Sequence, residues 1–223
     1  MNLVNTPESR EGNLIRYAVY LAGYLMARGV VKIVTMNSPL RVWDLILFVL
    51  ITAMVLLFYI YRFNREQRFF QRDFVLPWLG NYGATVILTL IVIVTRIGVS
   101  WLQAYNKVSW YGFQAEYLRH ESVSMFWFLI VAIGIVLPIL QEYLATGFLF
   151  NYMFRRNEVS VAILGMLTSG ILFSLFNFQM SIPLFFINIF YGALFAWSYL
   201  YTQTLWMPIY LSVLNGVMLV IMT

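Results

Sequence analysis

The sequence predicts an all-α fold, a polytopic membrane bundle of six to eight helices, and three observations support this fold class. Of the 223 residues, 62% are hydrophobic and only 10% are charged, whereas a soluble domain carries roughly 25% charged residues. Apolar segments of about 20 residues, the length that crosses a bilayer, recur along almost the whole chain. Basic residues gather in the short polar stretches between them, as the positive-inside rule describes.

Seven segments account for the predicted helices. Six are long and apolar enough to span the membrane: residues 42–62, 77–104, 122–154, 159–177, 183–201 and 206–223. The seventh, residues 13–34, carries Arg16, Arg28 and Lys32. It is expected either to span with its charges near the ends or to lie in the membrane interface as an amphipathic helix. Together they predict one membrane domain, with N-terminal helices and an outer loop over residues 1–121 and core helices over residues 122–223.

Two arginine-rich loops set the expected orientation. They are residues 62–73, with Arg62, Arg65, Arg68 and Arg72, and residues 155–158, with Arg155 and Arg156. Basic loops stay in the cytoplasm, and the two assignments agree because two spans separate the loops. Loop 105–121 is then expected outside. In the first loop the arginines alternate with Phe69 and Phe70, which favours binding to the anionic headgroups of membrane lipid.

Several classes of function are excluded by composition. Cysteine is absent, and histidine occurs once, at His120 in a polar loop. The chain therefore has no thiol nucleophile and cannot alone supply two imidazoles for a metal site or a catalytic triad. We expect no metal and no cofactor. The net charge of +5 follows from basic helix ends, so no nucleic acid is expected as a partner. The compact loops and missing cysteine favour the plasma membrane of a Gram-positive bacterium.

A glutamate interrupts the apolar run at residues 137–150. Glu142 lies where an acid costs on the order of 3 kcal/mol even on lenient insertion scales. Polar side chains at matched depth usually face each other across a bundle interior. Counting along each helix from its cytoplasmic end places Gln141, Glu142 and Asn188 near mid-membrane, Ser212 and Asn215 closer to the cytoplasm, and Asn177 nearer the outer surface. Together with Thr146, these residues are expected to line a polar cavity.

Three stretches of the C-terminal half have a distinctive spacing. They read QEYLATG at residues 141–147, FSLFN at residues 173–177 and PIYLSVLNG at residues 208–216. Together they resemble the CPBP/Abi family of intramembrane proteases, which includes the CAAX-processing endopeptidase. In that family successive helices carry EExxxRG, FxxxH and HxxxN behind a proline. The resemblance covers about residues 120–223 and implies a helical bundle of the CAAX-protease-like type.

The reactive side chains of these motifs are replaced. In the first motif Gln141 stands for the leading glutamate and Thr146 for the arginine, while Asn177 replaces the histidine of the second. In the third, Ser212 stands for the histidine and Gly216 for the asparagine, with Asn215 one position early. Amides and hydroxyls cannot act as a base at neutral pH. The resemblance therefore implies the fold of a protease and argues against its activity.

We interpret Glu142 as the retained second acid of a degenerate site. It is expected to fix helix packing through hydrogen bonds to Asn188, Asn215 or Gln141, and the alternatives are a role in binding a partner and residual catalysis. Asp44 and Arg96 are expected to form an ion pair, the alternative being that each side chain reaches its own headgroup region.

Aromatic residues gather around the predicted outer loop. We interpret them as an aromatic belt at the membrane interface, with a docking surface for a partner as the alternative. The residues concerned are Trp101, Trp110, Tyr111, Phe113 and Tyr117.

Three functions remain open. The first is a catalytically inactive scaffold or regulator of a partner membrane protein, such as a cell-wall hydrolase or a sensor kinase, which the resemblance implies because degenerate members pair with such proteins. The second is an active intramembrane peptidase that uses Glu142. The third is a bacteriocin-immunity protein.

Overall fold

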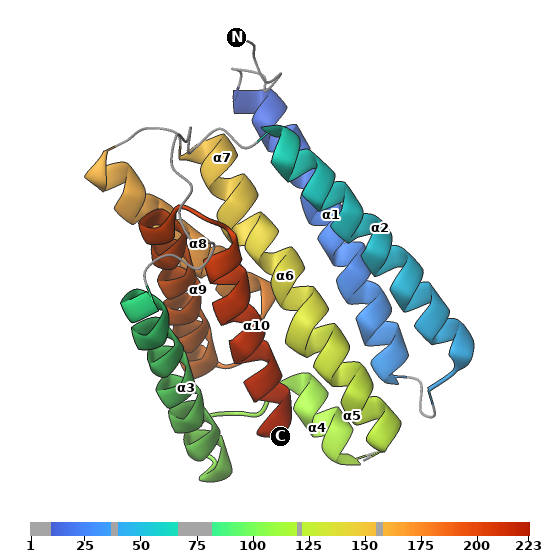
Figure 1. Ribbon diagram of the computed structural model, residues 1–223. Helices are drawn as coiled ribbons and strands as arrows, with labels where there is room; N and C mark the ends of the chain where they lie inside the picture. The colour runs from blue at the N-terminus through green and yellow to red at the C-terminus, as the bar shows by residue number, and fades with distance from the viewer. Residues whose placement is uncertain (1–9, 37–39, 67–81, 120–121, 155–157) are drawn as a thin grey trace.

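The computed structural model describes residues 10–36, 40–66, 82–119, 122–154 and 158–223 (Figure 1). Regular structure in these residues is entirely helical, which confirms the all-α prediction. The elements are α1 (Arg10–Met36), α2 (Val42–Glu66), α3 (Tyr82–Ala104), α4 (Gly112–Arg119), α5 (Val123–Leu129), η1 (Ile130–Val136), α6 (Leu137–Glu142), η2 (Tyr143–Phe148), α7 (Leu149–Met153), α8 (Val159–Phe176), α9 (Ile182–Thr202) and α10 (Trp206–Ile221). Elements α5 to α7 form one continuous helical run, so the described residues make eight helices, within the predicted range.

Six of the described helices are long and apolar enough to cross a membrane, and the chain is a multi-pass membrane protein. They include α1, so length and composition favour a span over an interfacial helix for residues 13–34. The predicted span at residues 206–223 is shorter than expected. Its helix, α10, has 16 residues, or roughly 24 Å, against a hydrocarbon core of about 30 Å.

The helices pack around the run formed by residues 123–153 (Figure 1). Helices α1 and α2 pair along one side of it, and α1 also contacts α6, η2 and α7. Helix α10 packs on the run at η1 and α6, and it contacts α9 and α3 as well. Helices α8 and α9 pair along their length. Helix α3 therefore lies on the opposite side of the bundle from the α1–α2 pair.

The central run contains two π-helical turns, η1 and η2, on either side of α6. Pro138 at the start of α6 explains the first, because proline lacks an N–H and its ring clashes with the carbonyl four residues earlier, at Gly134. In the second, the Leu144 carbonyl accepts a hydrogen bond from the Tyr17 hydroxyl of α1, at 3.2 Å. Such turns are frequent at functional sites, and here they enclose the short segment that carries Gln141 and Glu142.

A buried glutamate that the sequence patterns did not point to joins three helices at one end of the bundle. Glu66, at the end of α2, is 2% exposed. Its carboxylate pairs with Arg62 of the same helix and, at 3.2 Å, with Arg16 of α1. It also accepts hydrogen bonds from the hydroxyls of Tyr20 and Tyr152. This network ties the α1–α2 pair to the end of the central run.

The same contact bears on orientation. Because Glu66 and Tyr152 meet, α2 and α7 end on the same side of the bundle, and the two basic loops that follow them leave from that side. Their cytoplasmic location stays a prediction. The loop residues 67–73 and 155–157 lie outside the described residues, as does His120, so the headgroup-binding prediction for Arg68, Phe69, Phe70 and Arg72 has no structural counterpart here.

Candidate functional site

The site begins at Gln141, on the last turn of α6. Its side chain is buried and donates a hydrogen bond from Nε2 to the Tyr24 hydroxyl of α1, at 2.7 Å. The same amide forms a reciprocal pair with Asn177, at the end of α8. Gln141 Nε2 donates to Asn177 Oδ1 and Asn177 Nδ2 donates to Gln141 Oε1, each at 3.3 Å. Two positions where the resembling family carries a glutamate and a histidine are thus occupied by amides that bond to each other.

Glu142 points into the protein interior. Its side chain is 0% exposed, and Oε2 accepts a hydrogen bond from the Thr146 hydroxyl one turn later, at 2.8 Å. Oε1 has no hydrogen-bond partner among the described residues. The Ser212 hydroxyl of α10 approaches the carboxyl group without reaching hydrogen-bond geometry. The expected hydrogen bonds to Asn188, Asn215 or Gln141 are therefore not formed, because the carboxyl turns toward its own helix.

Five of the predicted polar residues line one small cavity of about 40 Å³. They are Gln141, Asn177, Asn188, Ser212 and Asn215. Glu142 and Thr146 are buried beside α10 but do not line it. Asn188 Oδ1 accepts a hydrogen bond from the Tyr111 hydroxyl, at 3.1 Å, whereas Ser212 Oγ and Asn215 Oδ1 have no partner among the described residues.

A larger cavity of about 460 Å³ adjoins the small one. The two share Tyr111, Leu137, Gln141 and Asn177 among their lining residues. Helix α1 supplies another wall, with Tyr24, Arg28 and Lys32. A volume of this size lies in the range of roughly 300–1,000 Å³ that is usual for ligand sites.

Gly216 brings α10 into close contact with the central run. A Cβ atom at Gly216 would lie 2.8 Å from the Gly134 carbonyl oxygen and 2.9 Å from Pro138 Cγ. Because the nearest atom belongs to the backbone, no side-chain movement relieves this contact. Position 216, where the resembling motif has an asparagine, therefore has no room for a side chain.

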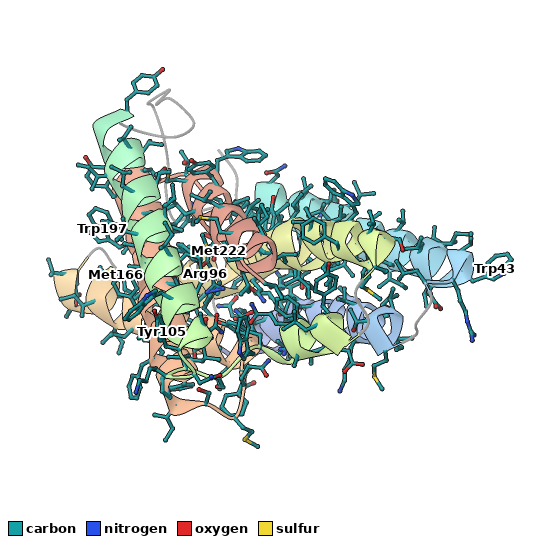
Figure 2. The ribbon with its side chains drawn as sticks, turned by 90° about the horizontal axis from the view of Figure 1, so that it is seen from below. Trp43, Arg96, Tyr105, Met166, Trp197 and Met222 are labelled. Carbon is teal, nitrogen blue, oxygen red and sulfur yellow. The ribbon has the colours of Figure 1, made fainter. Side chains whose placement is uncertain are left out.

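The predicted ion pair between Asp44 and Arg96 is not formed. Arg96 is 0% exposed, and its Nε, Nη1 and Nη2 make no hydrogen bond within the described part of the chain. Its guanidinium carbon lies 5.7 Å from the centre of the Tyr111 ring. Figure 2 shows Arg96 far across the molecule from Trp43, the neighbour of Asp44. The ion pair was predicted because the two residues lie at a similar depth in the membrane, but their helices lie on opposite sides of the bundle.

The aromatic residues of the outer loop separate into two groups. Tyr111 is buried, which excludes it from the predicted docking surface. Burial raises the pKa of its hydroxyl, although nearby Arg96 and the Asn188 hydrogen bond oppose the shift, so the hydroxyl stays protonated and can donate to Asn188. Trp101 is exposed, while Trp110, Phe113 and Tyr117 are half-buried. These four remain available as a belt or as a contact surface.

Metal-binding side chains do not gather at the site. Within the described ranges, no three His, Asp or Glu side chains lie close enough together to hold a metal ion. Gln141, Asn177, Asn188 and Asn215 offer neutral oxygen atoms. The carboxylates nearby are Glu142, buried next to Gln141, and Glu116, which lines the larger cavity.

Comparison with protein families gives one match. Residues 123–218 match the family described as Type II CAAX prenyl endopeptidase Rce1-like. The match contains all three motif stretches, and it contains the run with the two π-helical turns. Comparison with curated proteins and with solved structures found no match. Residues 123–218 are thus similar to the Rce1-like type II CAAX prenyl endopeptidases, and the match covers somewhat less than half of the chain.

Proposed function

We propose that this chain has lost the endopeptidase chemistry of its family and acts as a membrane scaffold that holds and regulates a partner membrane protein. The observation that carries the proposal is the reciprocal amide pair between Gln141 and Asn177. An acid and an imidazole at these positions would exchange protons, whereas two amides only hold each other in place.

The Gln141–Asn177 pair argues against peptidase activity because peptide hydrolysis needs reactive groups that amides cannot replace. A positioned general base and an electrophilic partner each contribute roughly 10²- to 10⁴-fold to the rate. Glu142 is the one carboxylate left in the motif, and the groups nearest to it are the hydroxyls of Thr146 and Ser212. The crowded backbone at Gly216 supports the same proposal, since it leaves no room for the third motif's asparagine.

The proposed partner is another membrane protein, such as a cell-wall hydrolase or a sensor kinase, in the plasma membrane of a Gram-positive bacterium. Helix α3 offers a suitable contact surface because it packs mainly on α10. Its apolar side chains Val94, Ile97 and Trp101 are exposed, and such a surface faces either lipid or a second protein.

A second function, intramembrane peptidase activity by Glu142, is favoured by one specific observation. Its carboxyl is buried in the segment that matches a protease family, and Oε1 has no hydrogen-bond partner in the described residues. An unoccupied carboxylate oxygen in a closed site is available to orient water or a peptide.

One substitution distinguishes the two functions. Glu142→Gln keeps the size of the side chain and an acceptor for Thr146, and it removes the capacity to transfer a proton. A scaffold should retain partner capture, measured by affinity purification in mild detergent and mass spectrometry, and should retain the partner's cellular activity. Neither wild-type protein nor variant should cleave a prenylated CAAX peptide above background.

The contrary result is equally specific. If Glu142→Gln abolished cellular function or peptide cleavage while expression and partner capture stayed normal, the protein would be a peptidase. Thr146→Val is the matched control, because it removes the hydrogen bond to Glu142 and leaves the carboxylate in place.

A further inference from the structure

Helix α1 forms one wall of the larger cavity. Three of its residues, Tyr24, Arg28 and Lys32, follow one another at spacings of four on α1, so they share one helix face. Helix α1 lies outside residues 123–218, the segment that matches the endopeptidase family. The residues of this wall therefore lie outside the matched segment.

Two cations lie on this wall. Arg28 donates from Nη1 to the Phe176 carbonyl, and this hydrogen bond uses one of the five N–H donors of a guanidinium. The Lys32 side chain forms no ion pair or hydrogen bond with a described residue. One carboxylate, Glu116 of α4, also lines the cavity, and it has an interaction of its own. The cavity therefore carries a net positive charge.

Apolar side chains also line the cavity. Among them are Ile133 and Leu137 of the central run and Leu219 of α10. Lys32 and Arg28 lie four and eight residues before the end of α1 at Met36, or roughly 6 and 12 Å along the helix axis. Lys32 is thus at the depth of the headgroups and Arg28 is just beneath it.

We propose that this cavity binds an anionic phospholipid, with its phosphate between Arg28 and Lys32 and part of an acyl chain against Ile133 and Leu137. Arginine and lysine side chains both bind phosphate groups through charge-assisted hydrogen bonds. A lipid fits better than a soluble anion because the cations and the apolar side chains share one space. The proposal goes beyond the scaffold function and holds whether or not the chain cleaves peptides.

The test is native mass spectrometry of the purified full-length protein in mild detergent, titrated with phosphatidylglycerol or phosphatidylcholine of identical chains. The wild type should retain phosphatidylglycerol preferentially. Arg28→Gln/Lys32→Gln should weaken this binding roughly 30-fold, since each basic side chain at a charged membrane surface contributes roughly a fivefold factor.

The matched control is Arg41→Gln/Lys107→Gln, which removes two exposed charges that do not line the cavity. It should change the affinity less than twofold. Equal losses in both double variants, or equal retention of the two lipids by the wild type, would overturn the proposal. Inorganic phosphate should not displace the lipid at millimolar concentration. Displacement would show a site for a free phosphate group and would overturn the lipid assignment.

A second variant keeps the test decisive if the double substitution unfolds the protein. Thr35 is half-buried and lines the cavity. Within the described residues, its hydroxyl bonds only to the Lys32 carbonyl of its own helix. Thr35→Phe narrows the cavity and removes no charge, so it should also reduce phosphatidylglycerol retention at an unchanged melting temperature. Full retention by Thr35→Phe would show that the lipid binds elsewhere.

Discussion

At the scale of single residues, the site is held by polar groups that satisfy one another across three helices. Tyr24 of α1, Gln141 of α6 and Asn177 of α8 form a continuous set of hydrogen bonds. An unsatisfied buried polar group costs about 1–3 kcal/mol. Removal of one of these side chains therefore lowers stability mainly because its former hydrogen-bond partners stay buried without their full set of hydrogen bonds.

The first prediction concerns Gln141→Ala. The substitution removes the hydrogen bonds of Gln141 to the Tyr24 hydroxyl and to Asn177, whose Nδ2 keeps only its bond to the Phe173 carbonyl. It should therefore lower the free energy of unfolding by about 2–4 kcal/mol. Thermal unfolding of the purified protein in detergent measures this loss. Gln141→Glu is the matched comparison, because its carboxylate still accepts from Asn177 Nδ2 and can accept from the Tyr24 hydroxyl once that O–H turns toward it. It should cost less. Equal stability of the alanine variant and the wild type would show that the amide pair contributes nothing.

The second prediction concerns Arg96. Its guanidinium nitrogens are buried and have no acceptor among the described residues, and the Tyr111 ring is the compensating contact, worth up to about 2 kcal/mol. Because desolvation of a charge costs several kcal/mol, Arg96→Met should raise the free energy of unfolding by about 1 kcal/mol. Arg96→Lys keeps the charge and should give no gain. A destabilised Arg96→Met variant would mean that a bound group supplies the missing acceptor.

At the scale of secondary-structure elements, the site depends on how α10 meets the irregular part of the central run. The close approach of Gly216 to Gly134 sets their distance. Proline and glycine at these positions were visible in the sequence and accompany the first π-helical turn. The length of the turns was not predictable, because it depends on contacts such as the one between Tyr17 and the Leu144 carbonyl.

The third prediction compares two glycines. Gly216→Ala places a methyl group against the backbone carbonyl of Gly134, and overpacking of this kind costs about 1–3 kcal/mol. Gly98 of α3 has open space around its Cβ position, so Gly98→Ala should gain up to about 1 kcal/mol through helix propensity. Melting temperatures of the two variants should move in opposite directions. A stable Gly216→Ala variant would show that the two helices can separate without cost.

At the scale of the whole molecule, most of the bundle was predictable and its lateral arrangement was not. Hydropathy located all of the candidate spans. Depth along the helices grouped Asn188 and Asn215 with Gln141, and the motif resemblance added Asn177 to the same cavity. Depth alone carries no information on which way a helix faces. This is why the Asp44–Arg96 pair was wrong, and why the contact of α1 with Gln141 through Tyr24 was not foreseen.

The buried position of Glu66 was also not predictable from the sequence. Its spacing of four residues from Arg62 is a readable helix pair, but its burial depends on Arg16 and Tyr152, which are distant in the sequence. A single sequence shows local charge patterns and does not show which distant residues complete them.

The fourth prediction concerns orientation and uses the absence of native cysteine. Asn64 and Ser109 are both exposed, one near the end of α2 and the other after α3, at opposite ends of the bundle. An impermeant maleimide should label Ser109→Cys in intact cells and spare Asn64→Cys until the cells are lysed. The reverse labelling would place the arginine-rich loops outside.

The contacts of α1 also have a consequence for biosynthesis. Arg16 finds its carboxylate at Glu66 as soon as the first helical pair has been synthesised, whereas Arg28 depends on the Phe176 carbonyl, which the ribosome adds more than a hundred residues later. A charge within a membrane helix is costly until it is paired. In the newly inserted α1, Arg16 therefore has its partner early, while Arg28 at the other end of the helix does not. It can settle fully against its neighbours only after α8 has entered the bilayer, which makes the closing of the cavity wall a late step in assembly.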